Sequence, residues 1–559
     1  MHGKIGSPAA VMAVASQANQ PLCGEADVFF PLSTTVPGIS ALTDSARAAT
    51  RAEQKMTFRR AFRLYPKAIL WSILLSSTII MDGYDMSLLT SFFTFPTFQK
   101  SYGELLPATM SQDTSNQQQL YQISPAWQAG LINGTQVGVI LGLIGNGLVA
   151  DHFGYRRTLI AALVALGAFV FLAVFARNIT TLLVAQVLCG IPWGVFQTLS
   201  VSYAAEVMPV ALRGHFLSYI NLCWVLGQTL GVVVIRSLVD TESDWAYRLP
   251  FALQWVFIVI IIIGVSFSPE SPWWLIRQNK LEEARKSLLR LTSRGAGALC
   301  VDETVAMMSL TNKVEQYLGY GNISYRNCFR GVDLRRTEIT TMVWATQQLC
   351  GSTLTFYAAY FYEQAGFRVH GALDLALGMY GLSIGANVIS WLLLPWVGRR
   401  RLYLVGASLS LTPAQSWVLG SLIVVLTFIY QMTLGPVCYM LVAEIPSTRL
   451  RVKTVVVGRV VYNITSIITN TIAPRMLNPT AWNWKGKSCF LFVVTTILCL
   501  VWCYFRLPEP FGLSFLEIDI LFEKRASAAK FRVLQRNLER SGYNDISRSQ
   551  RGNITWQRY

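Results

Sequence analysis

Long apolar blocks alternate with short polar stretches along most of this chain. A helix of about 20 apolar residues crosses the hydrocarbon core of a bilayer, and each block is close to or above that length. The pattern therefore predicts an all-α integral membrane protein with twelve transmembrane helices. We expect the spans at 68–93, 127–150, 158–176, 179–205, 213–238, 248–267, 338–362, 373–397, 402–419, 421–443, 453–475 and 487–506.

The polar stretch 268–335 divides these spans into six and six. Two six-helix bundles around a central site are a common transporter architecture. The predicted division is an N-terminal tail at 1–66, an N-terminal bundle at 67–267, a middle loop at 268–335, a C-terminal bundle at 336–506 and a C-terminal tail at 507–559.

The ninth span differs from the others. Between Arg401 and Glu444 only 42 residues must cross the membrane twice. A helix of 18 residues reaches about 27 Å at about 1.5 Å per residue, which barely crosses. The stretch 402–419 also contains Pro413. We therefore expect helix 9 to be short or defective.

Composition and charge support the membrane prediction. Only 14% of the residues are charged, against about 25% in soluble chains. The formal charge is +17, and the basic residues gather in alternate loops, which indicates membrane orientation and contact with anionic lipid rather than nucleic acid binding. The positive-inside rule places both termini and 268–335 in the cytosol. The ten cysteines show no metal-ligand spacing, so we expect neither a metal nor a cofactor.

The two halves share an internal repeat at corresponding helix ends. Charged residues at such ends can form ion pairs that close a gate, although they can also serve orientation alone. Exposed pairs contribute only about 0–1 kcal/mol each, so a gate requires a network. The repeat pairs Ala205, Glu206, Pro209 and Arg213 with Ala443, Glu444, Pro446 and Arg449, and Gly154, Arg156 and Arg157 with Gly398, Arg399 and Arg400. The predicted gating residues are Asp151, Arg156, Arg157, Glu206, Arg213, Glu444 and Arg449.

Three charged residues lie inside apolar spans: Asp82 and Asp85 in the first and Arg459 in the eleventh. A charge at bilayer depth costs about 2.5–3.5 kcal/mol on insertion scales. We therefore expect these groups to face one another or a wet cavity. A carboxylate beside a movable arginine can carry a proton, so the three are candidates for proton coupling. The alternative is an ion pair that only packs helices.

Amide side chains also lie within the spans, at Gln347, Gln348, Asn221 and Gln228. An amide offers both donors and acceptors, which suits the hydroxyl groups of a sugar. The alternative is hydrogen bonding between helices. We take the four residues as candidate substrate-binding groups.

Five motifs in order along 68–520 resemble those of the sugar porter branch of the major facilitator superfamily. The resemblance implies the major facilitator fold and sugar transport. The motifs comprise Gly147, Asp151, Gly154, Arg156 and Arg157; Pro269 to Leu275; Gln347, Gln348 and Gly351; Gly435 and Pro436 with Glu444 to Arg449; and Pro508 to Pro510.

Further stretches are similar to fungal α-glucoside (maltose-type) proton symporters, and they lie at 82–85, 189–194, 221–224, 443–450 and 477–487. By this resemblance, Thr353 and Tyr439 are added to the candidate substrate-binding groups, since many sugar porters carry Asn and Trp there. Two positions depart from the pattern. Val139 stands where these symporters carry a coupling Glu, and Asp82 replaces a longer Glu.

The sequence thus predicts transmembrane transport of a sugar such as maltose by alternating access, and no enzymatic activity. It leaves open whether protons are coupled, because Val139 cannot hold one. The alternatives are an uncoupled facilitator and a non-transporting sugar sensor. We expect a monomer in contact with membrane lipid, in the plasma membrane, with cytosolic termini.

Overall fold

A computed structural model of the chain describes residues 49, 52–53, 56–105, 121–293, 298–317, 324–353, 358, 362, 369–409, 419–477, 488–511, 513, 515–523, 525–528 and 531. Nearly all of them are helical. The described strands are short: β1 (Glu104–Leu105) and β2 (Tyr121–Gln122) form an antiparallel pair.

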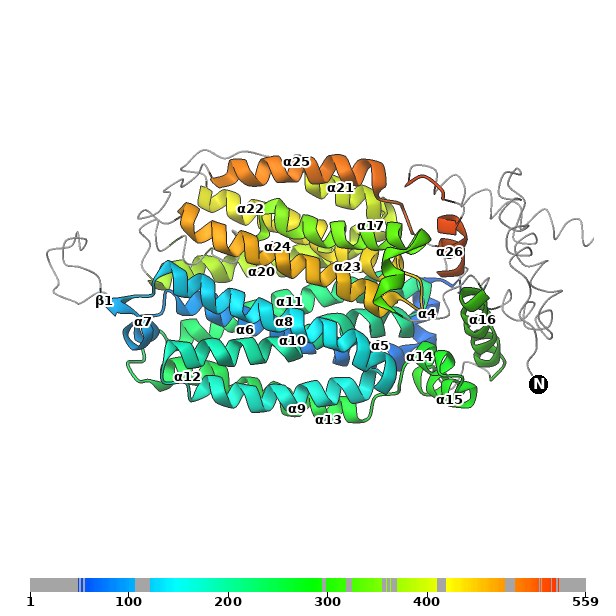
Figure 1. Cartoon of the computed structure of the whole chain (residues 1–559), viewed down its shortest axis with the longest axis horizontal. Coiled ribbons are helices and arrows are strands. Elements are labelled where there is room, and N and C mark those ends of the chain that lie inside the picture. The colour runs from blue at the N-terminus through cyan, green and yellow to red at the C-terminus, as the bar shows by residue number, and fades with distance from the viewer. Residues whose placement is uncertain are drawn as a thin grey trace, which may run out of the picture.

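The N-terminal half contains six rod-like units that run side by side (Figure 1). Two of them start where the sequence favours a helix start, since Pro66 and Pro125 occupy first-turn positions. The units are α5 (Pro66–Ser76) with α6 (Thr78–Phe92), α8 (Pro125–Phe153), α9 (Tyr155–Val174), α10 (Ile179–Val207), α11 (Val210–Leu238), and α12 (Trp245–Ala252) with α13 (Gln254–Ser266).

The C-terminal half repeats this plan and lies above the first half in Figure 1. Its first unit, α17 (Gly331–Gln347), passes into the π-helical turn η4 (Gln348–Ser352), where Gly351 has a φ of 91°. A π turn often marks a functional site in a helix. The remaining units are α20 (Val369–Val397), α21 (Arg399–Leu409), α22 (Leu419–Met432) with α23 (Leu434–Glu444), α24 (Arg451–Leu477) and α25 (Ser488–Arg506).

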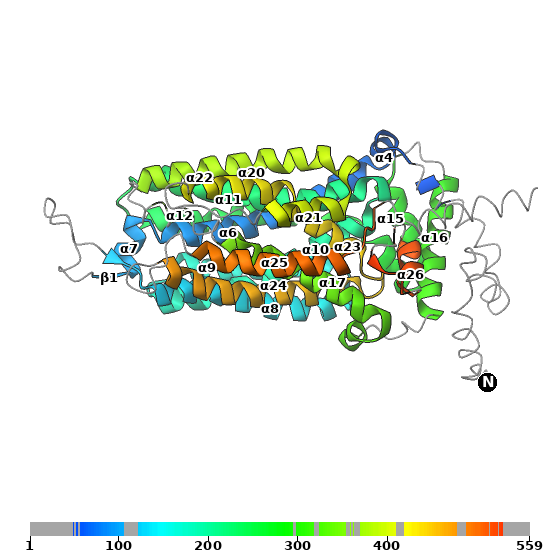
Figure 2. The same cartoon turned by 90° about the horizontal axis from the view of Figure 1, so that it is seen from above.

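Eight helices of the described chain are long and apolar enough to cross a membrane on their own. A ninth crossing is counted if the pair Phe58–Leu64 and Pro66–Phe92, bent by 86°, forms one span. The other units, α17, α21 and α25, lie alongside them in the bundle (Figure 2). Residues 410–418 lie outside the described residues, so the predicted defect of helix 9 is not tested beyond α21.

The two halves meet along a narrow set of helices. In this interface α8 packs against α24, and α11 packs against α20 and α23. Within the N-terminal half, α8 and α10 approach closely through glycines. A Cβ atom on Gly138 would lie 1.9 Å from the Val187 carbonyl oxygen, and one on Gly142 would lie 2.0 Å from that of Ile191. Small residues at such crossings allow backbone contact between membrane helices.

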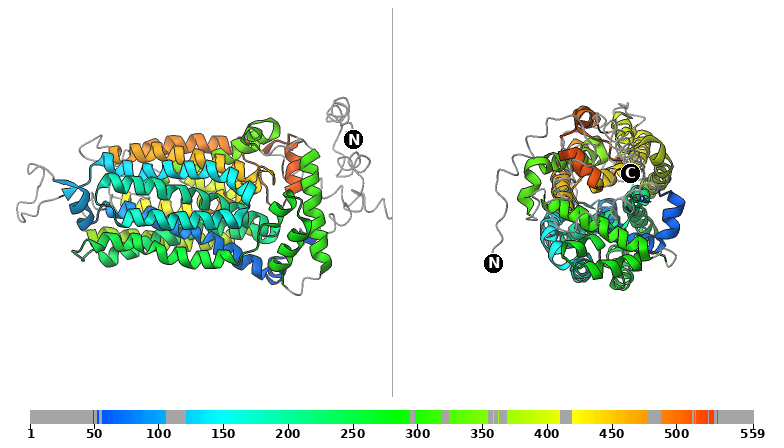
Figure 3. Two further views of the ribbon diagram at one scale, coloured as in Figure 1. Left: turned by 60° about the horizontal axis from the view of Figure 1, so that its bottom comes forward. Right: turned by 90° about the vertical axis from the view of Figure 1, so that its right-hand side faces the viewer.

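One end of the bundle carries a layer of short helices, and we call it the capped end (Figure 3). The layer consists of α14 (Pro272–Arg277), α15 (Leu281–Leu291), α16 (Ala298–Tyr317) and α26 (Phe515–Glu523), with η3 (Tyr325–Phe329) and α4 (Phe58–Leu64) beside it. The stretch 268–335, which we predicted as a loop, is thus largely helical where the structure describes it. The opposite end carries α7 (Pro96–Tyr102) and the β1–β2 pair.

Candidate functional site

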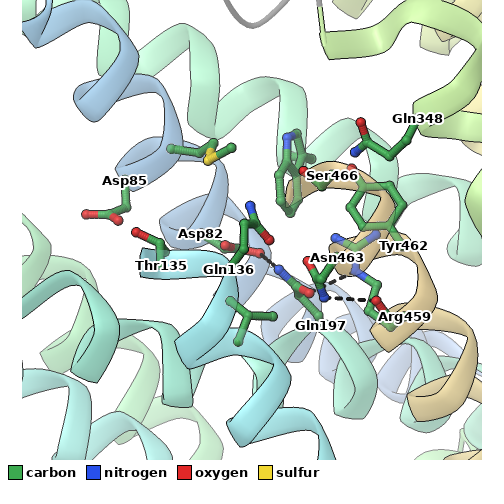
Figure 4. A pocket seen from close by; sticks show the side chains of 13 residues that line it. Asp82, Asp85, Thr135, Gln136, Gln197, Gln348, Arg459, Tyr462, Asn463 and Ser466 are labelled. Atoms are coloured by element: carbon green, nitrogen blue, oxygen red, sulfur yellow. Dashed lines mark hydrogen bonds between the residues drawn. The ribbon is translucent and has the colours of Figure 1, made fainter. Parts of the chain in front are cut away.

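A cavity lies between the two halves near the middle of the helices (Figure 4). Its free volume is about 10 Å³, which is about the space that one water molecule needs. The site is thus closed in this conformation, and any ligand larger than water requires the halves to separate. The lining residues are Asp82, Asp85, Met86, Thr135, Gln136, Val139, Gln197, Trp224, Gln348, Arg459, Tyr462, Asn463 and Ser466.

A chain of hydrogen bonds crosses this cavity. The Gln197 amide nitrogen donates to Asp82 Oδ2 at 2.8 Å, and Arg459 Nε donates to Gln197 Oε1 at 2.8 Å. Asp82 and Gln197 belong to the N-terminal half and Arg459 to the C-terminal half. The predicted charges therefore meet in one cavity, but through an amide that the sequence analysis did not single out.

Aromatic rings surround the Arg459 guanidinium. Its central carbon lies 4.0 Å from the ring centre of Tyr462, 4.4 Å from Trp344 and 5.6 Å from Trp224. A cation held over ring faces gains about 2 kcal/mol or more when it is desolvated. The rings hold the guanidinium in place while leaving its hydrogen-bonding edge toward Gln197.

Asp85 has a separate environment. Its Oδ1 accepts a hydrogen bond of 2.8 Å from the Gln254 amide of α13, within the same half. In Figure 4 it lies on the side of Asp82 away from Arg459. Asp85 shares the cavity with Asp82 but not its link to the C-terminal half. Val139 is buried in the wall of the same cavity. The position where this sequence has valine in place of glutamate therefore lies at the cavity itself.

The amide side chains at the junction of α17 and η4 take two different positions. Gln348 lines the cavity, and its Oε1 accepts hydrogen bonds of 3.2 Å from Ser352 and Thr353. Gln347 instead donates to the Gly435 carbonyl oxygen at 3.3 Å. Thr353 continues the polar path to Thr469 of α24 at 2.9 Å.

A second polar cluster joins the halves away from this cavity. The Asn221 amide donates to Asn387 Oδ1 at 2.8 Å and to Gln431 Oε1 at 2.7 Å. The predicted residues Gln228 and Tyr439 are both buried, and Tyr439 packs edge-on against Trp344 with ring centres 5.0 Å apart. The sequence analysis missed Gln197, Gln254, Asn387 and Gln431, although amides inside apolar spans were the signal that could have found them.

At the capped end, ion pairs link the two halves. Lys453 of α24 pairs with Asp151 of α8. Arg277 of α14 donates to Glu206 at 3.0 Å and to the Thr448 carbonyl oxygen at 3.1 Å. Arg451 lies 3.8 Å from the same Glu206 carboxylate. The predicted gating residues Asp151 and Glu206 thus lie in these ion pairs, with partners that the sequence analysis did not name.

The repeat appears in the structure as two matching helix starts. Glu270 accepts the backbone N–H groups of Tyr155 and Arg156 at 2.9 and 3.2 Å. Glu509 accepts those of Arg399 and Arg400, both at 3.1 Å. In each half a carboxylate thus binds the positive end of a helix. Gly154 and Gly398 precede these helices with φ values of 86° and 79°, which glycine adopts without strain.

Burial raises the pKa of Glu270 above its ordinary value, although the N–H groups of Ser271, Tyr155 and Arg156 lower it in part. The remaining gating candidates differ in placement. Arg399 pairs with Glu444 at 3.1 Å within the C-terminal half. Arg156 donates to the Ser266 carbonyl oxygen, Arg449 is buried and Arg157 is exposed.

Phe515 of α26 links both halves through its ring. The ring centre lies 3.9 Å from the guanidinium carbon of Arg213 and 4.0 Å from that of Arg451. Arg213 belongs to α11 and Arg451 to α24, so the C-terminal segment closes the capped end across the interface. Trp273 of α14 completes the cluster, with its ring centre 5.9 Å from that of Phe515.

Two halves of membrane-length helices around a buried polar centre, closed at one end by ion pairs, define a membrane transporter of the major facilitator type. Residues 71–522 match the family model described as "Sugar (and other) transporter", and the chain belongs to this family. It is a multi-pass membrane transporter, and the family confirms the expectation that it is not an enzyme.

Relatives and solved structures agree with this assignment. The chain is 38% identical over 507 residues to the general alpha-glucoside permease of Saccharomyces cerevisiae, covering 88% of this chain and 80% of the relative. It is 37% identical over 506 residues to the maltose permease MAL31 of the same species, covering 87% and 81%. The proton:xylose symporter XylE, here bound to 6-bromo-6-deoxy-D-glucose, has the same fold, with a TM-score of 0.67 at 18% identity, covering 82% of this chain and 99% of that chain. The source of XylE is Escherichia coli.

Proposed function

We propose that this chain carries an α-glucoside such as maltose across the plasma membrane by alternating access. The observation that carries the proposal is the central cavity, where Gln348 and the Asp82–Gln197–Arg459 chain lie together at the interface between the halves. Amide, carboxylate and guanidinium groups supply the donors and acceptors that sugar hydroxyls require. The names of the yeast relatives support an α-glucoside as the substrate.

In this proposal the sugar contacts Gln348 and the surrounding polar groups once the halves part. The other candidate groups are Gln347, Asn221, Gln228, Thr353 and Tyr439. Asn387 and Gln431 join them because they share hydrogen bonds with Asn221.

Proton coupling is the second part of the proposal. In the Asp82–Gln197–Arg459 series, the hydrogen bond from Arg459 to Gln197 is the one that crosses between the halves. Separation of the halves therefore moves the guanidinium away from Asp82. A proton on Asp82 would then compensate for the lost positive charge. Asp85 lies in the same cavity as a second carboxylate. Because Val139 replaces a third, we expect coupling to be weaker than in a symporter with a carboxylate there.

The capped end is the cytosolic end in this proposal. The basic residues Arg156, Arg399 and Arg400 lie there, as the positive-inside rule requires for cytosolic loops. The pairs Lys453–Asp151 and Arg277–Glu206 then form the inward gate. The tails at 1–66 and 507–559 and the segment 268–335 are cytosolic, around bundles at 67–267 and 336–506, and the protein acts as a monomer among membrane lipids.

Uptake of labelled maltose by a yeast strain that lacks its own transporters tests the proposal. We expect uptake above that of the empty host, and a moderate increase at acidic external pH. Val139 favours a second candidate, a sugar sensor that binds without transport. Maltose binding with normal surface delivery but no uptake at any pH would support the sensor and overturn transport.

A further inference from the structure

A second, open pocket lies at the rim of the capped end, apart from the central cavity. It forms where α17 begins, α25 ends and α26 packs against them, and it has about 400 Å³ of open space. The residues that matter for its chemistry are Arg335, Arg506, Arg525, Phe505, Phe522 and Ser527. Neither the transport site nor the gate uses this pocket.

Three guanidinium groups from three separate segments surround it. Arg506 is held by Glu338, with Nε to Oε1 at 3.0 Å and Nη2 to Oε2 at 2.5 Å. Arg335 donates through Nη1 to the Ala526 carbonyl oxygen at 2.7 Å. Within the described residues, its buried Nε has no hydrogen-bond partner.

Carboxylates balance this positive charge only in part. Asp519 of α26 pairs with Arg336, with 2.6 Å between Asp519 Oδ1 and Arg336 Nη1. Of the three pocket arginines, Arg506 is the one that has a carboxylate partner among the described ion pairs. The pocket therefore offers two guanidinium groups, those of Arg335 and Arg525, to an anion. Guanidinium groups bind phosphate oxygens with two parallel hydrogen bonds.

The surroundings of the pocket place it at a membrane surface. Phe505, in its wall, is 68% exposed, and its neighbour Tyr504 is 62% exposed. Both belong to the last turn of α25, an apolar helix of the bundle. Exposed aromatic rings at the end of such a helix lie at the boundary between hydrocarbon and headgroups.

We propose that this pocket binds the phosphate-bearing headgroup of an anionic phospholipid, with Arg335 and Arg525 as the ligands of the phosphate and Phe505 beside the acyl chains. The inference rests on the proposed cytosolic orientation of the capped end, since anionic lipids are concentrated in the cytosolic leaflet. Basic pockets between membrane helices on that side are suited to such headgroups.

A bound headgroup would also hold α26 in place. Arg525 and Ser527 lie within four residues of the end of α26, whereas Arg335 belongs to α17, so the phosphate would connect the two. The same α26 carries Phe515, which contacts Arg213 and Arg451 across the interface. The lipid site is therefore joined to the closed capped end by one short helix.

Native mass spectrometry of the purified full chain tests the proposal, with phosphatidylserine and phosphatidylcholine added in equal amounts. We expect preferential retention of phosphatidylserine. Arg525→Gln should reduce the retention about fivefold, the effect of removing one arginine near an anionic surface, and Arg335→Gln should do the same. Arg525 is exposed, so its replacement should leave the fold unchanged. Thermal unfolding of each variant checks this.

Arg326→Gln is the matched control, since this arginine is exposed on η3 and does not line the pocket. It should retain phosphatidylserine as the parent chain does. Equal retention of both lipids, or equal losses in the control and the pocket variants, would overturn the proposal. In a parallel arm, inorganic phosphate alone should raise the melting temperature less than phosphatidylserine does, and an equal rise would overturn the lipid assignment. Because no sugar is present, these outcomes are independent of whether the chain transports maltose.

Discussion

Arg459 and Asp82 lie on opposite halves of the molecule and are joined through the side chain of Gln197. Asp82 and Gln197 can move together with the N-terminal half. The hydrogen bond of 2.8 Å from Arg459 to Gln197 therefore breaks when the halves part. This relationship connects the opening of the cavity with the electrostatic environment of a buried carboxylate, and the predictions about transport follow from it.

Replacing Gln197 with leucine should disable transport. Gln197→Leu leaves a buried carboxylate and a buried guanidinium without their shared partner, and breaking such a buried pair costs about 3–5 kcal/mol. We expect maltose uptake to fall at least about tenfold and the melting temperature to drop. Gln186→Leu, on the same helix, is the control, because Gln186 does not line the cavity and accepts its hydrogen bond from Thr135, outside the chain that joins Asp82 to Arg459. Equal uptake in the two variants would count against the proposed role.

Placing a carboxylate at position 139 should strengthen proton coupling. Val139 is buried in the cavity wall that also holds Asp82 and Asp85. In Val139→Glu the added acid can hold a proton, so the ratio of uptake at acidic to neutral external pH should rise, and an uncoupler should abolish more of the uptake. Val139→Gln has nearly the same shape without the titratable group and should keep the parent pH profile. If both variants change the pH profile equally, the effect comes from packing and not from a proton.

The two neighbouring glutamines at the junction of α17 and η4 should behave differently. Gln348 lines the cavity, whereas Gln347 donates to the backbone at Gly435. Gln348→Ala should raise the KM for maltose about tenfold, because one or two hydrogen bonds to the sugar are lost at about 0.5–1.5 kcal/mol each. Gln347→Ala should lower the melting temperature more than it raises KM. An equal rise in KM for both would indicate that Gln347 turns toward the sugar when the cavity opens.

The ion pair of Lys453 and Asp151 should stabilise the closed capped end. Their side chains are 3% and 21% exposed, so Lys453→Gln leaves a partly buried carboxylate without its partner. We expect a shift of about fivefold, or about 1 kcal/mol, toward the open form. The distance between spin labels at the exposed positions Lys286 and Arg401, measured by electron paramagnetic resonance in a cysteine-free background, reports the shift. The exchanged pair, Asp151→Lys with Lys453→Asp, should restore the short distance. Failure of the exchange to restore it would show that charge pairing is not what closes this end.

The sequence determined the main features of this fold because length and apolarity are local properties. The spans at 127–150 and 213–238, for example, lie within α8 and α11. The repeat was visible because glycines such as Gly154 and Gly398 must take a positive φ before a helix start. The structure of the polar segments was harder to predict from the sequence. The polar stretch 268–335 holds α14, α15 and α16, whose positions depend on packing against the bundle and not on membrane length.

The charged residues of the candidate site could be predicted from the sequence, but their hydrogen-bond partners could not be predicted as well. Asp82, Asp85 and Arg459 stand out because a buried charge in an apolar span requires a partner, and all three line one cavity. Their partners, Gln197 and Gln254, are neutral amides inside apolar spans, which is a weaker signal than a charge because many such amides only join helices. Which of Gln347 and Gln348 faces the cavity depends on the π turn at η4, which a helical period does not predict.

Counterflow in vesicles tests most directly whether the central cavity alternates between the two sides. The purified chain is reconstituted into liposomes loaded with unlabelled maltose, and labelled maltose is added outside without any proton gradient. A carrier exchanges the two, so labelled maltose should accumulate transiently inside, and Gln197→Leu should abolish the accumulation. Binding of maltose by the reconstituted protein without any counterflow would contradict the account.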